Sequence, residues 1–103
     1  MRRHTWSEHP QAREDLFAAA DRLPPDLAEQ LIRRSESAVE DILGGPASWP
    51  PVPYWNGSVI LRWRTVRPFR IHVVYYLAGD EVRVIAYAHE AREPGYWQHR
   101  VVE

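Results

Sequence analysis

The chain has 103 residues, of which 45% are hydrophobic and 26% are charged. This composition is typical of one soluble globular domain spanning residues 1–103, and it excludes a disordered tail. The absence of cysteine excludes disulfides, thiolate nucleophiles and cysteine-based zinc or iron–sulfur sites. The first residues lack the apolar run of a signal peptide, and no apolar stretch approaches the length that crosses a membrane. We therefore expect a cytoplasmic protein with no membrane partner.

All 13 cationic side chains are arginine, and they are unevenly distributed. Residues 1–53 carry 6 arginines and 9 acidic residues, whereas residues 54–103 carry 7 arginines and 5 acidic residues. The net charge of −1 therefore combines an acidic first half with a mildly basic second half. Nucleic-acid-binding domains are usually more basic, so this balance disfavours tight non-specific binding of RNA or DNA.

The first half of the chain predicts two helices. Apolar residues recur at helical spacing before the pair Pro24-Pro25, and again after it as far as Gly44-Gly45-Pro46. The prolines end the first helix and open the second, and the glycines end the second. Two helices with so short a link form an antiparallel hairpin. Residues 46–57 hold four prolines and three aromatic side chains, and they predict a loop whose aromatics pin it to the core.

The second half predicts three strands of a sheet. Alternating patterns cover residues 58–66, 69–77 and 81–89, with a hairpin turn over residues 78–81. Residues 2–6 are a candidate for one more strand, and residues 94–99 predict a helical turn that begins at a proline. The predicted class is α+β, with the helical hairpin packed on one face of a small, mostly antiparallel sheet.

Strict alternation assigns the strand side chains to two faces. The face toward the helices receives Val59, Leu61, Trp63, Ile71, Val73, Val82 and Val84. The opposite face receives a polar set, which consists of Arg62, Arg64, Arg70, His72, Tyr76, Arg83, Tyr87 and His89. A shift of one residue in a strand's register would exchange its two faces.

The polar set has two interpretations. Arginines that bind phosphate, with histidine and tyrosine for proton transfer, suit the cleavage of a phosphodiester. The alternative is a solvated sheet face on which arginine stems cover apolar surface. The five histidines lack the spacing of a metal site, and the chain has no glycine-rich phosphate loop. We therefore expect no metal and no cofactor.

The third predicted strand and the residues after it resemble a known family. Residues 82–97, VRVIAYAHEAREPGYW, followed by Arg100, are similar to the C-terminal signature of the RelE/ParE toxin superfamily. That signature is a strand ending in histidine, then arginine, proline and an aromatic pair, closed by arginine. The earlier features follow in the family's order, including the helix start Pro10-Gln11-Ala12, the pair Pro68-Phe69 and the turn Gly79-Asp80. The resemblance covers nearly the whole chain.

The resemblance implies the toxin of a type II toxin–antitoxin system, a class associated with plasmid stabilisation and growth inhibition. It further implies a cognate antitoxin whose C-terminal segment wraps the toxin in a hetero-oligomeric complex. RelE-like members cleave mRNA on the ribosome with basic residues, often lysines, and a tyrosine or histidine. ParE-like members lack that set and poison DNA gyrase. This chain has no lysine, and its run from His89 to Trp97 is more similar to the ParE-like branch, which we favour.

The candidate site residues differ between the two branches. Contact with a target is expected from Arg62, Arg64, Arg83, Arg92 and Trp97. Catalysis in a RelE-like nuclease would fall to Arg62, Arg64, Arg83, Tyr87 and His89. Structural roles are the alternative, with Trp97 as a packing anchor, His89 as a strand-end cap, and Arg92 and Arg100 bound to acidic or carbonyl groups. A third interpretation is a binding module of the same superfamily without toxicity.

Overall fold

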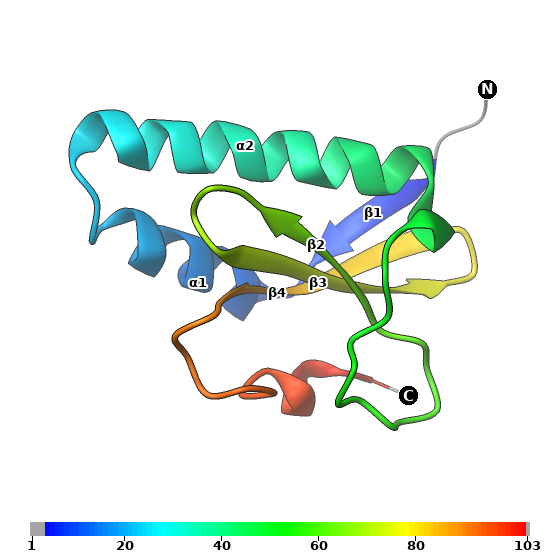
Figure 1. Ribbon diagram of the computed structural model, residues 1–103. Helices are drawn as coiled ribbons and strands as arrows, with labels where there is room; N and C mark the ends of the chain where they lie inside the picture. Colours follow the sequence, from blue (N-terminus) through cyan, green and yellow to red (C-terminus); the bar gives the residue numbers. More distant parts are fainter. Residues whose placement is uncertain (1–3, 103) are drawn as a thin grey trace.

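The computed structural model describes residues 4–102 and places two helices over one face of a four-stranded sheet (Figure 1). The elements in chain order are β1 (Thr5–Glu8), α1 (Pro10–Ala20), α2 (Pro25–Gly44), β2 (Arg62–Val66), β3 (Ile71–Ala78) and β4 (Glu81–His89). The strand order is β1-β4-β3-β2, in which β1 is parallel to β4 and the other neighbours are antiparallel. The predicted α+β class is confirmed. Within residues 4–102, no helix is long and apolar enough to span a membrane.

The helical hairpin lies where the proline and glycine pattern predicts it. Pro10 and Pro25 occupy the first helical positions, where an N–H would have no partner within the helix. His9 precedes α1, and its Nδ1 accepts the backbone N–H of Gln11 at 3.1 Å. After α2, the N–H of Gly45 donates to the carbonyl of Ile42 at 3.1 Å, and a proline follows that cannot continue the helix.

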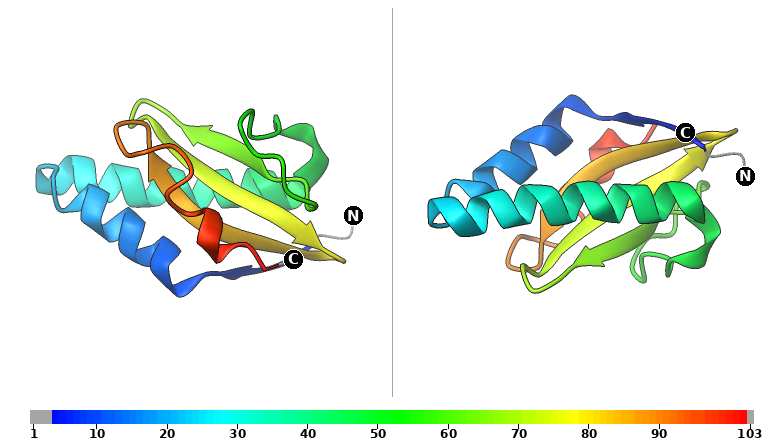
Figure 2. Two further views of the ribbon diagram at one scale, coloured as in Figure 1. Left: turned by 90° about the horizontal axis from the view of Figure 1, so that it is seen from below. Right: turned by 90° about the horizontal axis from the view of Figure 1, so that it is seen from above.

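Apolar side chains are buried on both faces of the sheet. Beneath the helices lie Leu16, Leu31, Ile42, Ile71, Val73 and Val84, among others. The opposite face is covered by the loop before β2 and by the C-terminal segment, which Figure 2 shows crossing it in green and red. The buried side chains there include Val52, Leu61, Val74, Ile85 and Trp97. Because both faces are covered, β3 carries the unbroken buried run Val73–Tyr76 in place of an alternation of apolar and polar residues.

The faces predicted for β2 are reversed in the structure. Trp63 pairs with Val74 and Arg64 pairs with Val73, so each shares the face of its partner on β3. Val59, Leu61 and Trp63 therefore lie on the side opposite the helices, whereas Arg62 and Arg64 lie on the helix side. The alternation within β2 is correct, but the pairing with β3 decides which set faces the helices.

Several element boundaries differ from the sequence-based expectations. β2 begins at Arg62, later than expected, because the residues before it belong to the loop. Pro51 of this loop forms an isolated bridge with Arg62. The C-terminal turn is a 3-10 helix at Gln98–Arg100, later than the expected residues 94–99. The N-terminal strand is β1 at Thr5–Glu8, and the first residues of the expected strand lie outside the described residues. Glycine at 79 (φ 62°) forms the predicted hairpin turn.

We expect Leu16→Ala to lower the free energy of unfolding by about 2–5 kcal/mol, because it leaves a cavity in the core beneath the helices. Its neighbour Phe17 is 51% exposed, and Phe17→Ala is the matched control, with an expected loss of about 1 kcal/mol or less. Urea unfolding of both variants checks this. Equal losses at the two positions would contradict the packing of α1 described above.

Candidate functional site

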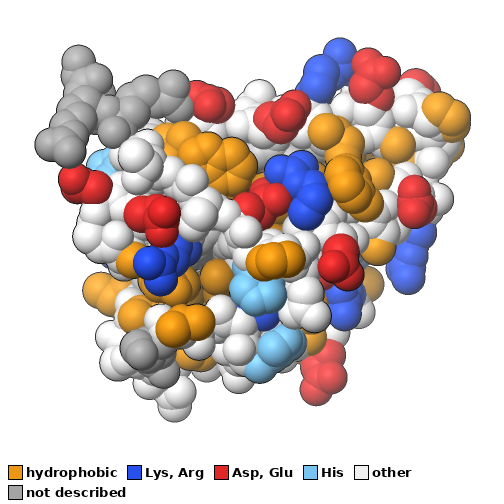
Figure 3. Space-filling model, turned by 180° about the vertical axis from the view of Figure 1, so that it is seen from behind, with side chains coloured by type: hydrophobic (Ala, Val, Ile, Leu, Met, Phe, Trp, Pro, Cys, Tyr) orange, Lys and Arg blue, Asp and Glu red, His pale blue; other side chains and the backbone are white. Residues whose placement is uncertain are grey.

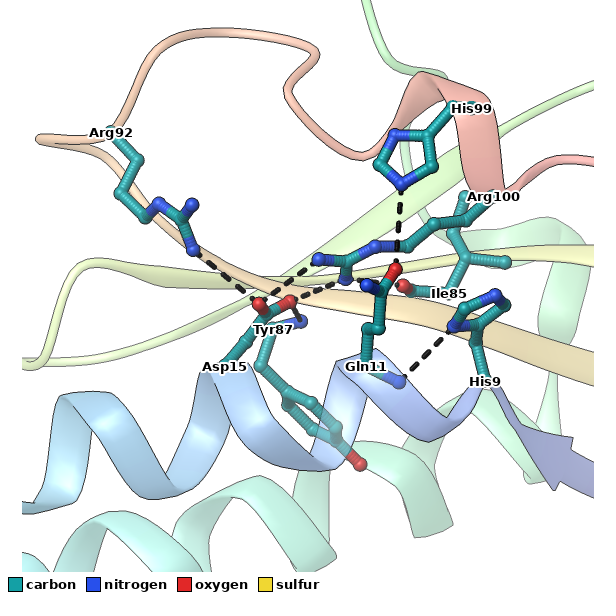
Figure 4. A network of polar contacts seen from close by, with 8 residues as sticks. All are labelled: His9, Gln11, Asp15, Ile85, Tyr87, Arg92, His99 and Arg100. Atoms are coloured by element: carbon teal, nitrogen blue, oxygen red, sulfur yellow. Dashed lines mark hydrogen bonds and ion pairs between the residues drawn. The ribbon is translucent and has the colours of Figure 1, made fainter.

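A buried ion pair between Asp15 and Arg100 joins α1 to the C-terminal segment (Figure 4). Arg100 Nη1 lies 2.7 Å from Asp15 Oδ2, and Nη2 lies 3.2 Å from Oδ1. Only 6% of the Arg100 side chain and 5% of the Asp15 side chain are exposed. A second guanidinium, from Arg92, lies 3.4 Å from Asp15 Oδ1. Because a buried charge is tolerated only with partners, this cluster holds three segments in one arrangement.

The same ion pair completes the edge of β4. β1 pairs with β4 only as far as Val84, whose carbonyl accepts the N–H of His9 at 2.8 Å. Beyond that point, Arg100 Nη1 donates to the carbonyl of Ile85 at 2.9 Å, and Asp15 Oδ2 accepts the N–H of Tyr87 at 3.3 Å. Two side chains thus supply the hydrogen bonds that a longer β1 would have supplied.

A β-bulge turns Tyr87 toward the helices. The register shifts between Val74, which pairs with Ala86, and Tyr75, which pairs with Val84, so Ile85 is the extra residue of β4. Val84 and Tyr87 consequently both lie beneath the helices, although in a regular strand residues three apart would face opposite sides. His89, which pairs with Ile71 from the same core, follows Tyr87 to that side. The prediction that Tyr87 and His89 share the face of Arg83 is wrong, because strict alternation does not allow for the bulge.

The hydroxyl of Tyr87 is engaged within the protein. It donates to Glu8 Oε2 at 2.6 Å, and the Glu8 carboxylate also binds Arg13 through two contacts of 2.8 Å. Burial, reinforced by Glu8, raises the pKa of Tyr87 far above its ordinary value. The phenol therefore stays protonated near neutral pH and ties β4 to β1 and α1.

Aromatic side chains fill the sheet face opposite the helices. Trp97 is 1% exposed, and its ring centroid lies 6.2 Å from that of Tyr54 and 6.4 Å from that of Trp55. Trp63 stacks on His72 with centroids 3.9 Å apart. Burial lowers the pKa of His72, so its imidazole is neutral at neutral pH. The hollow that remains beside these rings measures about 120 Å³.

Each predicted target-binding arginine has a partner inside the chain. The contacts are Arg62 Nη1 to the carbonyl of Trp49 (2.8 Å), Arg64 Nη2 to Asp41 Oδ2 (2.8 Å), Arg83 Nε to Glu81 Oε1 (2.7 Å) and Arg92 over the ring of Tyr96 (3.6 Å to its centroid). Arg62 and Arg64 lie on β2, Arg83 lies beside the β3–β4 turn, and Arg92 follows β4. The structure does not gather them around one phosphate-sized spot, and their contact with a target stays a prediction.

His89 and Arg100 have structural contacts that the sequence offered as alternatives. His89 Nδ1 accepts the N–H of Ala91 at 3.0 Å, which caps the end of β4. Arg100 binds both an acidic group and a carbonyl, which confirms that interpretation for Arg100. Among residues 4–102, no group of three histidine or acidic side chains is placed to hold a metal ion.

A groove of about 490 Å³ opens between the helical hairpin and the adjoining ends of β3 and β4. Its apolar lining comprises Ala18, Ala19, Leu23, Leu31, Phe69 and Ile71, and Arg22 and Arg92 add positive charge to it. The groove thus brings apolar side chains of both helices together beside the strand ends. Figure 3 shows the side of the molecule that carries α1 and β1, where hydrophobic side chains lie among charges of both signs.

Asp15 is the residue of this network that sequence analysis missed. Its position between Ala12 and Leu16, both fully buried, places it on the apolar stripe of α1. An acidic residue on such a stripe indicates a buried partner of opposite charge, because a buried carboxylate is tolerated only when it is paired. The sequence cannot identify that partner, because Arg100 lies 85 residues away.

Comparison with known proteins finds similarity among solved structures. No protein-family model matches the sequence, and no curated protein matches it. A solved chain of the chromosomal ParDE toxin–antitoxin (TA) system from P. aeruginosa has a similar fold, with a TM-score of 0.70. The alignment covers 84% of this chain and 95% of that chain, with 14% sequence identity. The two chains thus share a fold, in which two helices pack on a four-stranded mixed sheet.

We expect Asp15→Ala to lower the free energy of unfolding by about 3–5 kcal/mol, because it leaves the Arg100 guanidinium buried without its carboxylate. Glu14→Ala is the matched control, since Glu14 is an exposed acidic neighbour on the same helix. Chemical unfolding at neutral pH measures both. A loss at Asp15 no larger than that at Glu14 would contradict the role assigned to the ion pair.

Proposed function

We propose that this protein is the toxin of a type II toxin–antitoxin system. The observation that carries the proposal is the fold shared with the ParDE chain over most of both chains. The sequence of the C-terminal run supports the proposal independently. The residues that resemble the RelE/ParE signature are those that hold the C-terminal segment against the rest of the fold. Arg92 and Arg100 meet at Asp15, and Trp97 anchors the segment beneath the sheet.

We further propose that the toxin acts by poisoning DNA gyrase and not by cleaving mRNA. A nuclease of this fold needs phosphate-binding and proton-transfer groups together on the sheet face opposite the helices. Here tryptophan side chains occupy that face, Tyr87 is turned away from it, and Arg62 and Arg64 lie on the other side. Arginine is also a poor general acid or base, because it stays protonated.

The proposed target contacts come from the periphery of the fold. The side chains of Arg83 and Arg92 are 43% and 51% exposed, so each can bind a partner in addition to its internal contact. Arg62 and Arg64 extend this set along β2. Trp97 is 1% exposed, so its proposed part is indirect: it anchors the segment that follows Arg92.

Purified chain tested side by side on gyrase and on a translating extract distinguishes the two mechanisms. We expect loss of supercoiling with trapped DNA cleavage, and intact mRNA by primer extension. Arg92→Gln is expected to raise the concentration needed for half-inhibition about tenfold. The control Arg33→Gln, at an arginine paired with Glu29 on α2, is expected to have no effect.

Other outcomes have equally definite meanings. Codon-phased mRNA cuts with normal gyrase activity would establish the RelE-like nuclease instead. Unchanged growth of a bacterial host at confirmed expression, with neither activity in vitro, would favour a binding module without toxicity.

We propose that the cognate antitoxin docks its C-terminal segment in the groove between the helical hairpin and the strand ends. Much of the lining is apolar, and Arg22 and Arg92 add positive charge to it. Asp15 also lines the groove, but its carboxylate is already paired with Arg100. A segment with an apolar stripe and nearby acidic residues fits this surface, because burial of apolar area drives docking and opposite charges orient it.

Ala18→Arg tests the docking site, because Ala18 is exposed and lines the groove. We expect this variant to keep its toxicity and to lose neutralisation when the cognate antitoxin is co-expressed, since the long charged side chain blocks the groove. Ser37→Arg, at an exposed position of α2, is the control and should remain neutralised. Normal neutralisation of the Ala18 variant would place the antitoxin elsewhere.

A further inference from the structure

A second groove lies along the outer side of β2, where α2 and the loop before β2 meet the strand. Its volume is about 490 Å³, within the range of small-molecule sites. The lining residues are Arg34, Trp49, Pro50, Trp63, Arg64, Thr65 and Arg67. Three of the seven are arginines, and they come from three different elements of the chain.

Two of these arginines, Arg34 and Arg67, form neither a direct ion pair nor a hydrogen bond in the part of the chain that the structure describes, although Glu90 lies within electrostatic reach of Arg67. Both are exposed. Arg64, between them, is bound to Asp41 Oδ2 at 2.8 Å and to the carbonyl of Thr65. Asp41 offsets the charge of Arg64, and Glu90 offsets part of the charge of Arg67 while it is also bound to Arg70. The groove therefore keeps a net positive charge, carried mainly by Arg34, although the chain as a whole carries a net charge of −1.

Arg64 is held in place by the walls of the groove. Its guanidinium carbon lies 4.7 Å from the centroid of the Trp49 ring, and its contacts with Asp41 and Thr65 restrain it further. A cation fixed in this way needs little reorganisation when a ligand arrives. The free guanidinium groups of Arg34 and Arg67 then supply planar pairs of donors, which suit the oxygens of a phosphate.

We propose that this groove binds the terminal phosphate of a nucleotide, with the base against the indole walls. A phosphate monoester offers up to two negative charges and three acceptor oxygens, which match two free arginines beside a fixed third. The volume exceeds what a phosphate alone fills, and Trp49 and Trp63 provide aromatic surface for a planar base. The proposal does not depend on the proposed toxin function, since it concerns binding alone.

The nucleotide has two possible sources, a free mononucleotide or the phosphorylated end of a nucleic acid strand. Calorimetric titration of the full chain with AMP and with adenosine tests the first. Titration with a short oligothymidylate that carries either a 5′-phosphate or a 5′-hydroxyl tests the second. We expect binding of the phosphorylated ligands that weakens with added salt, and no binding of the two ligands without a terminal phosphate.

Variants that each remove one positive charge test which arginines bind the phosphate. Arg34→Gln and Arg67→Gln are each expected to weaken binding by about tenfold or more, because each removes a charge-assisted contact. The controls remove the same charge at paired positions: Arg33→Gln, beside Glu29, and Arg70→Gln, beside Glu90. Both controls are expected to bind as the unaltered chain does, and urea unfolding verifies that all four variants fold.

The outcomes separate the sources and can overturn the proposal. Binding of AMP supports a free nucleotide, and binding of the phosphorylated oligonucleotide alone supports a strand end. Equal binding of the phosphorylated and hydroxyl oligonucleotides would overturn the proposal in favour of general attraction to the nucleic-acid backbone. Failure of both phosphorylated ligands to bind, or unchanged binding in both groove variants, would also overturn it.

Discussion

The arrangement of this fold depends on one buried ion pair, between Asp15 on α1 and Arg100 near the C-terminus. The same two side chains satisfy the backbone of β4 at Ile85 and Tyr87, just where β1 ends. Desolvation offsets much of the attraction within such a pair, so we interpret it as specifying geometry more than adding stability. With the pair in place, the C-terminal segment can lie only beneath the sheet, with α1 along the edge of β4.

The position of the C-terminal segment shapes what the protein can do. Trp97 is drawn under the sheet, where it joins Trp55 and Trp63 in a second core. A hollow of about 120 Å³ remains beside these rings on that sheet face. The larger recesses lie instead at the periphery, one between the helices and the strand ends and one beside β2. These are the recesses in which we propose that a partner and a ligand bind.

Sequence analysis succeeded where the signal is local. The proline and glycine positions predict the helical hairpin, and the alternation within β3 correctly separates Ile71 and Val73 from His72 and Tyr76. Sequence analysis failed where the result depends on how one strand pairs with its neighbour. The faces of β2 depend on the pairing of Trp63 with Val74, and the side to which Tyr87 points depends on the β-bulge at Ile85. Sequence analysis consequently misplaced several candidate residues on the sheet faces and missed Asp15, and target contact by the predicted arginines stays a prediction.

The amino-acid sequence by itself determined the number of helices, the approximate strands, the α+β class and the resemblance of residues 82–97 to a toxin signature. Those features follow from periodicity, turn chemistry and residue order, which act over a few neighbouring residues. The tertiary structure alone decided which arginines meet a carboxylate and which remain free, because these contacts join residues far apart in the chain. Asp15 is neutralised by Arg100 from 85 residues away, whereas Arg34 and Arg67 line one groove without forming a direct ion pair within residues 4–102. Long-range pairing of charges is set by the packing of whole elements, and no local pattern encodes it.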